Sequence, residues 1–230
     1  MKLPQRDIHN HLLPGVDDGF RDVESTLQAI RLMAEAGCRD LVFTPHMNPD
    51  VYPDKTEDDF RRVYDELVPQ IPAAWGVTTA LAAEYMVVKD FEQRATHPET
   101  LLTYADGSIL IEMSYYFRST NLEDSVFNLK LSGARPILAH PERYLYLADD
   151  LQTFDNLRDA GCRFQMNLMS LTGVYGPASL HILKYLLSKG WYDFVGTDLH
   201  SLQQFDHILQ AKPKGFRLRQ MMRKAGEWNR

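Results

Sequence analysis

Short apolar runs alternate along the chain with longer stretches of helical period. The short runs predict seven strands, at Asp7–His9, Leu41–Thr44, Thr78–Ala83, Ile109–Glu112, Pro136–Ala139, Phe164–Asn167 and Phe194–Thr197. Apolar residues recur every three or four positions from Val23 to Ala34, which predicts a helix that ends at Gly37. Similar patterns precede Pro69 and Gly190, so helices are expected to separate the strands.

Regular alternation of strands and helices predicts parallel strand pairing with crossover helices, which is the α/β class. No linker, low-complexity tract or repeat of fixed period interrupts the pattern, so residues 1–230 are expected to form one domain. Periodicity does not separate an open doubly wound sheet from a closed one. Because the polar residues described below stand at strand ends, we predict a single distorted TIM-like (β/α)7 barrel with its site at the C-terminal rim of the strands.

Composition narrows the class of protein. An apolar content of 44% in 230 residues supports one substantial core, and a formal charge of −6 argues against nucleic-acid binding. Only residues 212–230 are locally basic, which indicates either a solvated terminal helix or a docking patch. The chain has no apolar run of about 18 residues and starts without an apolar leader segment, so we expect a cytoplasmic protein with no membrane span.

Histidines and acids stand at the ends of the predicted strands. Asp7, His9 and His11 alternate with Ile8 and Asn10, so in an extended chain the three would point to one face. The same alternation follows the last predicted strand, and single acids or histidines end the strands between; these residues are His46, Glu84, Glu112, His140, Asp198 and His200. The C-terminal ends of barrel strands converge around the axis, so this placement predicts a metal site there.

A fold-back loop offers one more acid, and the residues alone leave its identity open. Asp17 and Asp18 lie between Gly15 and Gly19 after the first strand, and either could reach the rim. Taken singly, a buried histidine is often structural and a strand-end acid often caps a helix. Six such coincidences favour metal binding, whereas the placement of the remaining histidines indicates a surface or helix position: His97, His181 and His207.

The donor set restricts the metal. Imidazole and carboxylate ligands without thiolate suit manganese, iron or zinc. Four ionised carboxylates contribute about −4, so two divalent ions would leave the site near neutral and three would leave it near +2. A positive site favours an anionic substrate such as a phosphate monoester, which is an argument for three ions.

These motifs carry a family resemblance from Asp7 to about His207. The chain resembles the polymerase and histidinol phosphatase (PHP) superfamily, and within it the bacterial protein-tyrosine phosphatases of capsule and exopolysaccharide loci. The resemblance rests on residues 7–11 (Asp-Ile-His-Asn-His), the Leu-Pro-Gly-Val-Asp-Asp-Gly that follows, Thr-Pro-His at 44–46, the lone Glu84 and Glu112, His-Pro-Glu-Arg-Tyr at 140–144, and Gly-Thr-Asp-Leu-His at 196–200.

The resemblance implies a seven-unit barrel that holds three divalent ions, with Mn²⁺ the foremost candidate and iron or zinc as alternatives. It implies that one ion is held by His9, His11, Glu84 and Asp198, a second by Glu84, Glu112 and His140, and the third by Asp18, His46 and His200. It thereby selects Asp18 over Asp17, and it assigns Arg143 to the substrate phosphate. Relatives often carry another arginine shortly after the final Asp-x-His, where this chain reads Ser-Leu-Gln-Gln-Phe at 201–205.

The implied reaction is hydrolysis of phosphotyrosine, and the implied partner is the tyrosine-rich tail of a bacterial tyrosine kinase. Arg143 would clamp two phosphate oxygens, a geometry that lysine cannot copy. Asp7 would support catalysis by orienting a histidine through its second ring nitrogen. Six aromatic residues either line the mouth of the site or pack the fold around it: Tyr52, Tyr115, Tyr116, Phe117, Tyr144 and Tyr146.

Three other functions compete with this interpretation. A cysteine-dependent tyrosine phosphatase needs an arginine at the sixth position after its cysteine, but Thr44 and Leu168 stand there for Cys38 and Cys162. The same metal site could instead act on histidinol phosphate or another small phosphoester, and the acidic balance weakens the case for a nucleic-acid end. A binding module stabilised by metals, without catalysis, belongs to a different class again.

Overall fold

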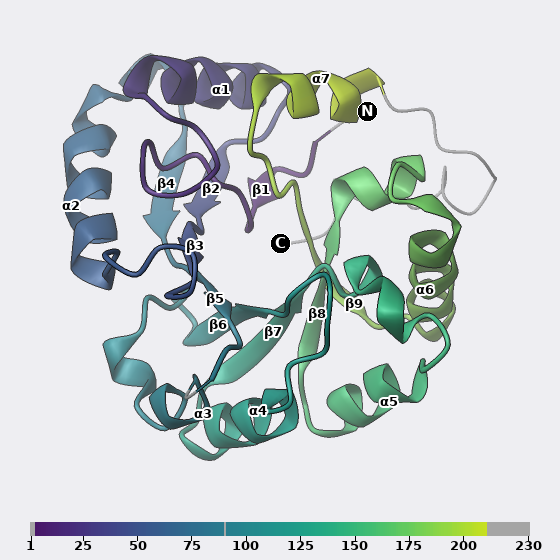
Figure 1. The fold of residues 1–230 in the computed structure, drawn as a ribbon. Coiled ribbons are helices and arrows are strands. Elements are labelled where there is room, and N and C mark those ends of the chain that lie inside the picture. Colours follow the sequence, from purple (N-terminus) through teal and green to yellow (C-terminus); the bar gives the residue numbers. More distant parts are fainter. Residues whose placement is uncertain (1–2, 90, 211–230) are drawn as a thin grey trace.

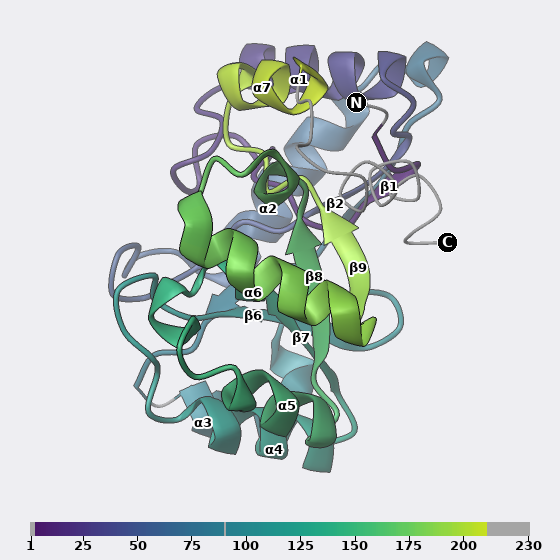
Figure 2. The same cartoon turned by 90° about the vertical axis from the view of Figure 1, so that its right-hand side faces the viewer.

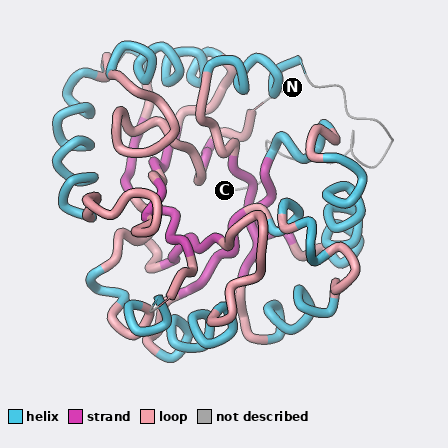
Figure 3. The backbone as a smooth tube through the Cα atoms, in the orientation of Figure 1, coloured by secondary structure: helices cyan, strands magenta, loops and turns pink. Residues whose placement is uncertain are grey.

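The arrangement of helices around strands is plain in the structure, a computed structural model that describes residues 3–89 and 91–210. Helices lie on the outside and strands near the centre (Figure 1, Figure 3). All strand pairs in this part of the chain are parallel, which confirms the α/β class with parallel sheets. Within the same residues no helix has the length and apolar character needed to cross a membrane. The basic segment 212–230 lies outside the described residues.

The strands form two sheets. The first has the order β1-β2-β4 and the second the order β3-β5-β6-β7-β8-β9. Their bounds are β1 Arg6–Asp7, β2 Asp40–Phe43, β3 His46–Met47, β4 Thr78–Leu81, β5 Glu84–Met86, β6 Ser108–Glu112, β7 Arg135–Ala139, β8 Arg163–Asn167 and β9 Tyr192–Gly196. All seven predicted strand positions are therefore occupied by strands.

The second and third predicted strands are each followed, after a short break, by a further short strand. β2 ends at Phe43 and β3 begins at His46, because Pro45 between them has no N–H to donate to a ladder. The pairing nevertheless continues across the interruption. The N–H of Ala82 donates to the Phe43 carbonyl at 2.9 Å, and the N–H of Glu84 donates to the Pro45 carbonyl at 3.0 Å. The second and third predicted strands thus run side by side, and the break divides them between the two sheets.

Helices follow the strands and cover them. Their bounds are α1 Val23–Glu35, α2 Glu57–Leu67, α3 Phe91–Arg94, α4 Leu122–Leu131, α5 Gln152–Asp159, α6 Gly176–Lys189 and α7 Leu202–Gln210. The sequence explains where the predicted ones begin: Asp22 caps α1 by accepting from the N–H of Ser25 at 2.8 Å, and Thr56 and Asp59 form a capping box at the start of α2. Views 90° apart show α1 and α7 side by side (Figure 1, Figure 2).

The first and last strand segments meet. Beyond β1, Asn10 forms a parallel bridge with Leu199, which lies beyond β9. The N–H of His11 donates to the Leu199 carbonyl at 3.0 Å, and the N–H of Asp198 donates to the His9 carbonyl at 2.8 Å. Residues at opposite ends of the described chain are therefore held in register at the predicted ligands.

A small apolar cluster links the two sheets from within. It is separate from the larger core that packs helices against strands. Phe194 of β9 packs against its buried members. These members are Ile8, Val42, Ala82, Tyr104, Leu110, Ile137 and Ala139. The Tyr104 hydroxyl donates to the Ile8 carbonyl at 2.7 Å, so this interior is tied to the segment that leads into the site.

Candidate metal centre

Nine acids and histidines named from the sequence come together at the ends of the strands. Four overlapping groups have ligand atoms within 4.8 Å of one another: His11, Asp18, His46 and His200; His9, His11 and Glu84; His9, His140 and Asp198; and His46, Glu84 and Glu112. Together these groups contain all nine of the residues named from the sequence and, within the described chain, no others. The strand-end pattern therefore corresponds to a real cluster in space.

Glu84 lies at the middle of the cluster. One carboxylate oxygen, Oε2, is 3.2 Å from His9 Nε2, 3.4 Å from His11 Nε2 and 3.1 Å from His46 Nδ1. The other, Oε1, is 3.0 Å from His140 Nε2. The Glu84 side chain has no exposure to solvent. One carboxylate that contacts four imidazoles in this way is placed to bridge more than one cation.

Two further acids extend the cluster on either side. Asp198 Oδ1 is 3.5 Å from His9 Nε2 and 3.3 Å from His11 Nε2, and it is fully enclosed. Asp18 Oδ1 is 3.5 Å from the Nε2 atoms of both His46 and His200, although 62% of its side chain is exposed. The Asp18 group therefore forms the solvent-facing side of the cluster and Asp198 the enclosed side.

Asp17 has a different task from Asp18. Its Oδ2 lies 2.8 Å from His11 Nδ1 and also accepts from the N–H of His46 at 3.1 Å. Gln165 does the same for His9, with Oε1 2.8 Å from His9 Nδ1. Both partners hold an imidazole through the ring nitrogen that faces away from the cluster, the usual arrangement around metal-binding histidines.

The nitrogens that face into the cluster fit a cation. With Nδ1–H donated to Asp17 and Gln165, the Nε2 atoms of His11 and His9 both carry lone pairs, yet they face each other at 3.2 Å. His46 Nδ1 lies 3.1 Å from Glu84 Oε2 and 2.8 Å from Glu112 Oε1, yet none of these three buried atoms, nor His140 Nδ1, makes a hydrogen bond of good geometry. Buried polar atoms normally have partners, so divalent cations are the chemical species these donor atoms match.

The electrostatics of the cluster favour positive charge. Burial lowers the pKa of His9, but the charges of Glu84 and Asp198 outweigh burial and raise it. Burial raises the pKa of Asp17, but the neighbouring His11 and its hydrogen bond outweigh burial and lower it to about 2. His200 is the exception, because burial and the charge of His11 lower its pKa to about 4. Burial raises the pKa values of Glu84 and Asp198, but the neighbouring histidines outweigh burial and lower them, so these two carboxylates stay ionised and attract cations.

Local backbone geometry brings the ligands this close. His140 and Asp198 are the two non-glycine residues of the described chain with positive φ, at 32° and 52°. Such conformations cost energy and concentrate at functional sites. Glycines make the close approach possible: a Cβ on Gly196 would lie 2.5 Å from His9 Cβ, and one on Gly19 would lie 2.2 Å from the His11 carbonyl oxygen. The Gly residues in both sequence motifs are thus needed for packing against the histidines.

Arg143 lies directly beside the cluster. Its Nη1 donates to Asp198 Oδ2 at 2.7 Å, and Asn167 Nδ2 donates to the same oxygen at 2.8 Å. The guanidinium carbon is 4.2 Å from the centre of the Tyr115 ring and 4.5 Å from that of Tyr175. Two aromatic faces and one carboxylate therefore hold the guanidinium plane, with further N–H groups available on its fork.

One glutamine in the Ser-Leu-Gln-Gln-Phe segment at 201–205 contacts the turn that carries two of the candidate ligands. Gln204 lies in α7, and its Oε1 accepts from the N–H of His200 at 2.7 Å. Its Nε2 donates to the Asp198 carbonyl at 2.8 Å. Gln204 thus fixes the turn that carries Asp198 and His200 and contributes no positive charge.

The contacts of Asp7 differ from the histidine-ring contact that we expected. Its carboxylate accepts from the N–H of Thr197 at 2.9 Å, from the Thr197 hydroxyl at 2.7 Å and from Asn10 Nδ2 at 3.2 Å. It therefore joins β1 to the end of β9. The ring-orienting residues are Gln165 and Asp17 instead, and the sequence signal for Gln165 is an amide between the apolar residues Phe164 and Met166 of a strand.

Several other residues lie away from the centre. The side chains of His97, His181 and His207 are exposed, as predicted. Cys38 and Cys162 are free thiols and both are buried. Burial raises the pKa of the Cys162 thiol to about 12, which opposes the thiolate that a nucleophilic cysteine needs.

Four of the six aromatic residues illustrate the two roles. Tyr144 is fully buried, accepts from the N–H of Met113 and donates to the Ala139 carbonyl, so it packs the fold. Tyr115 contacts the site: its hydroxyl is 3.3 Å from His140 Nε2 and its ring lies against Arg143. Tyr116 and Phe117 are exposed beside it.

Comparison with known proteins gives the family. Residues 5–214 match the family described as capsular polysaccharide synthesis, CpsB/CapC. The chain belongs to the CpsB/CapC family. This membership is consistent with the wider resemblance to the PHP superfamily.

Individual CpsB/CapC relatives are similar over most of their length. Tyrosine-protein phosphatase YwqE of Bacillus subtilis is 27% identical over 198 residues, which cover 86% of this chain and 78% of YwqE. Tyrosine-protein phosphatase CpsB of Streptococcus pneumoniae is 25% identical over 215 residues, covering 89% and 86%. A solved structure from work on YwqE and CpsB, described as unique metal-dependent tyrosine phosphatases, has a TM-score of 0.73 at 25% identity and covers 96% of this chain and 92% of that one.

A more distant structure shares only the fold. An amidohydrolase with bound zinc has a TM-score of 0.50 at 12% identity, with 94% of this chain and 81% of that one covered. This likeness supports the α/β architecture and nothing about activity.

Direct ligands and their supporting residues are expected to differ in their effect on metal binding. His11→Ala removes a donor atom and should lower the metal content per chain. Asp17→Ala removes only the partner that orients His11 and should weaken metal affinity by roughly 10–100-fold. Elemental analysis and calorimetric titration with Mn²⁺ measure both effects. Asp58→Ala, at a carboxylate that is 92% exposed, is the control. Unchanged metal affinity in the Asp17 variant would contradict its assigned role.

Proposed function

We propose that this protein is a metal-dependent phosphatase that hydrolyses phosphotyrosine in a protein substrate. The observation that carries the proposal is the position of Arg143, whose guanidinium lies 2.7 Å from Asp198 at the edge of a buried cluster of histidines and carboxylates. A cation-binding cluster beside a guanidinium fork suits a phosphate monoester. Membership of the CpsB/CapC family supports the same activity, since YwqE and CpsB carry the name tyrosine-protein phosphatase.

We propose three divalent ions, with Mn²⁺ foremost and iron or zinc as alternatives. In this assignment one ion is held by His9, His11, Glu84 and Asp198, a second by Glu84, Glu112 and His140, and the third by Asp18, His46 and His200. The third set is supported by a cluster of those residues with His11. His140 groups with His9 and Asp198 and also lies 3.0 Å from Glu84, so it adjoins both the first and the second proposed set.

The ions, when bound, lower the pKa of water and neutralise the charge on phosphate oxygens. The chain contributes position. Arg143 offers two parallel N–H groups to phosphate oxygens, and Tyr115 and Tyr175 keep its plane fixed. Water adds to phosphorus, the bond from phosphorus to the tyrosine oxygen breaks, and the products are inorganic phosphate and tyrosine. The phenol of free tyrosine has a pKa of about 10, so it leaves comparatively easily and no covalent nucleophile is required.

Further parts of the proposal concern context. We propose that the strands close as one seven-unit barrel over residues 1–230, which the contacts between residues 9–11 and 198–199 support. We also propose a cytoplasmic location and, as substrate, the phosphorylated tail of a bacterial tyrosine kinase that acts in capsule or exopolysaccharide production. The family description supports the link to capsule synthesis.

Elemental analysis tests the number of ions. Fully active protein is expected to hold three equivalents of transition metal per chain, because nine donor residues, Glu84 among them, form overlapping groups. A chelated sample should lose activity and recover it with Mn²⁺, whereas alkylation of thiols should leave most activity. Full activity at a single equivalent would contradict the three-ion assignment.

A substrate panel tests the reaction itself. One Mn²⁺-loaded preparation is assayed on a phosphotyrosine peptide, a phosphoserine peptide, histidinol phosphate and a simple aryl phosphate. Both aryl esters should be hydrolysed well, since their leaving groups are more acidic than the alkyl alcohols by several pKa units. Preference for histidinol phosphate would establish the small-molecule alternative, and absence of any turnover would establish a binding module.

Arg143 separates phosphate binding from metal assembly. Arg143→Ala should keep its metal but lose kcat/KM by on the order of 10–100-fold, since a charge-assisted hydrogen bond contributes about 1.5–3 kcal/mol. Arg143→Lys should recover only part, because it keeps the charge without the fork. Kinetics and metal content are measured together, with Arg61→Ala as a surface control. Wild-type efficiency in the alanine variant would show that another group holds the phosphate.

A further inference from the structure

A pocket of about 600 Å³ opens beside the metal centre. Its walls come from three segments, within residues 48–51, 86–92 and 114–121. Each segment continues directly from a strand that carries a candidate ligand: the first follows His46 in β3, the second follows Glu84 in β5 and the third follows Glu112 in β6. The pocket, called the rim pocket below, is therefore built by the same strand ends as the metal centre.

Tyr115 belongs to both places. It lines the rim pocket, while its hydroxyl is 3.3 Å from His140 Nε2 and its ring lies 4.2 Å from the Arg143 guanidinium. A phosphate held by Arg143 at the metal centre would therefore have the rest of its substrate next to the rim pocket. Because the Tyr115 side chain contacts both, the rim pocket adjoins the reaction site.

The rim pocket presents apolar side chains to solvent. Tyr116 is 89% exposed, Phe117 65% and Val51 60%, and all three line it. Adjacent exposed aromatic residues are uncommon on a surface without a partner, and aromatic residues are enriched where proteins bind one another.

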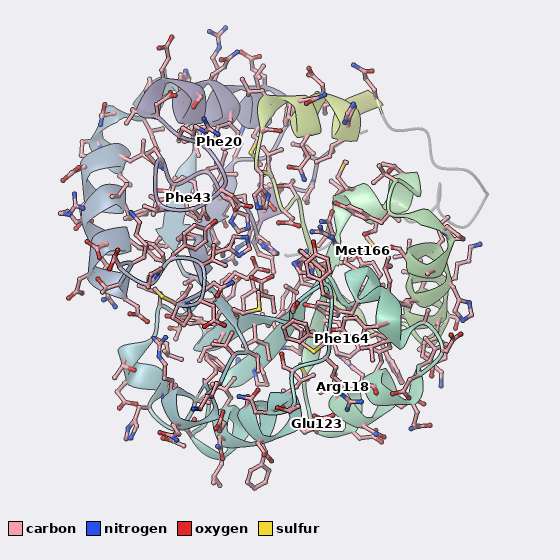
Figure 4. All side chains as sticks on the ribbon, viewed as in Figure 1. Phe20, Phe43, Arg118, Glu123, Phe164 and Met166 are labelled. Carbon is pink, nitrogen blue, oxygen red and sulfur yellow. The ribbon has the colours of Figure 1, made fainter. Side chains whose placement is uncertain are left out.

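Two of the four charged residues in the lining, Arg118 and Glu92, have local partners, and the other two, Asp50 and Lys89, are of opposite sign. Arg118 forms an ion pair with Glu123 and lies 3.5 Å from Asp150, and Figure 4 shows Arg118 and Glu123 together. Glu92 accepts a hydrogen bond from the side chain of Asn121. The lining carries two acids and two bases and so no net charge, and the rim pocket therefore suits apolar side chains better than a second anionic group.

We propose that the rim pocket binds the polypeptide that flanks the phosphotyrosine, with an apolar or aromatic residue of the substrate against Tyr116 and Phe117. This inference rests on the proposed function and names its substrate class more closely. A small phosphoester would end at the metal centre and leave the rim pocket empty. A second copy of the chain would need to bury about 1,200–2,000 Å², which is more than three exposed apolar side chains supply.

Three substrates and two variants test the proposal. The substrates are a phosphotyrosine peptide flanked by leucine and phenylalanine, the same peptide flanked by glycine, and a simple aryl phosphate. The test variant is Tyr116→Ser with Phe117→Ser. The matched control is Phe127→Ser on α4, an aromatic residue that is 64% exposed and does not line the rim pocket.

Wild-type protein should prefer the apolar peptide over the glycine peptide by on the order of 10-fold in kcat/KM, which corresponds to burial of about one aromatic side chain. The double variant should lose this preference through a higher KM. Its kcat/KM on the aryl phosphate should stay within about twofold of wild type, as a small substrate does not reach Tyr116. Phe127→Ser should behave as wild type on all three.

Other results would overturn the proposal. Equal use of both peptides by wild-type protein, an equal loss on all three substrates in the double variant, or the same loss in Phe127→Ser would each exclude a peptide subsite. Size-exclusion chromatography adds a further outcome: if the double substitution only dissociates an oligomer, the rim pocket is an interface between copies.

A binding measurement distinguishes failure of this inference from failure of the proposed function. Calorimetry with both peptides, each carrying a non-hydrolysable phosphotyrosine mimic, should give a Kd roughly 10-fold lower for the apolar one. Binding with that preference but without turnover of any substrate would contradict the phosphatase activity and leave the peptide subsite standing. Turnover without the preference would contradict the subsite alone.

Discussion

The burial of the Glu84 carboxylate is the constraint on which the rest of the site depends. An ionised carboxylate removed from water costs several kcal/mol unless cations and hydrogen bonds replace its hydration. Here four imidazoles lie within 3.0–3.4 Å of its two oxygens. These imidazoles have to come from different strands, because one strand can place only alternate residues on the inner face. Parallel strands that end at one rim meet this requirement.

Orientation of the histidines then falls to residues with no direct role in the cluster. Asp17 and Gln165 hold the outer ring nitrogens of His11 and His9. Asp7, which precedes both histidines in the chain, holds this segment to Thr197. Positive φ at Asp198 and the absence of a side chain at Gly196 bring the last strand against the first. The surrounding hydrogen bonds offset the energy cost of these conformations.

Much of this could be predicted from sequence because it depends on short-range patterns. The alternation of Asp7, His9 and His11 predicted that these side chains point to one face. The alternation of strands and helices predicted the α/β class. The roles of Asp17 and Gln165 could not be predicted, because they depend on how a loop folds back and on which strand lies opposite. The break at Pro45 divides a strand between two sheets, which periodicity does not register. The contact of Gln204 with Asp198 depends on a turn between a strand and a helix.

The hydrogen bond between Thr197 and Asp7 spans 190 residues of sequence. Such contacts form late in folding, because ordering the intervening chain precedes any gain from them. During synthesis from the N-terminus, His9 and His11 leave the ribosome long before the strand that will enclose them. The proposed metal ions would join these two ends only after the last strand has been made, and a nascent or truncated chain would present two unprotected histidines in place of a finished centre.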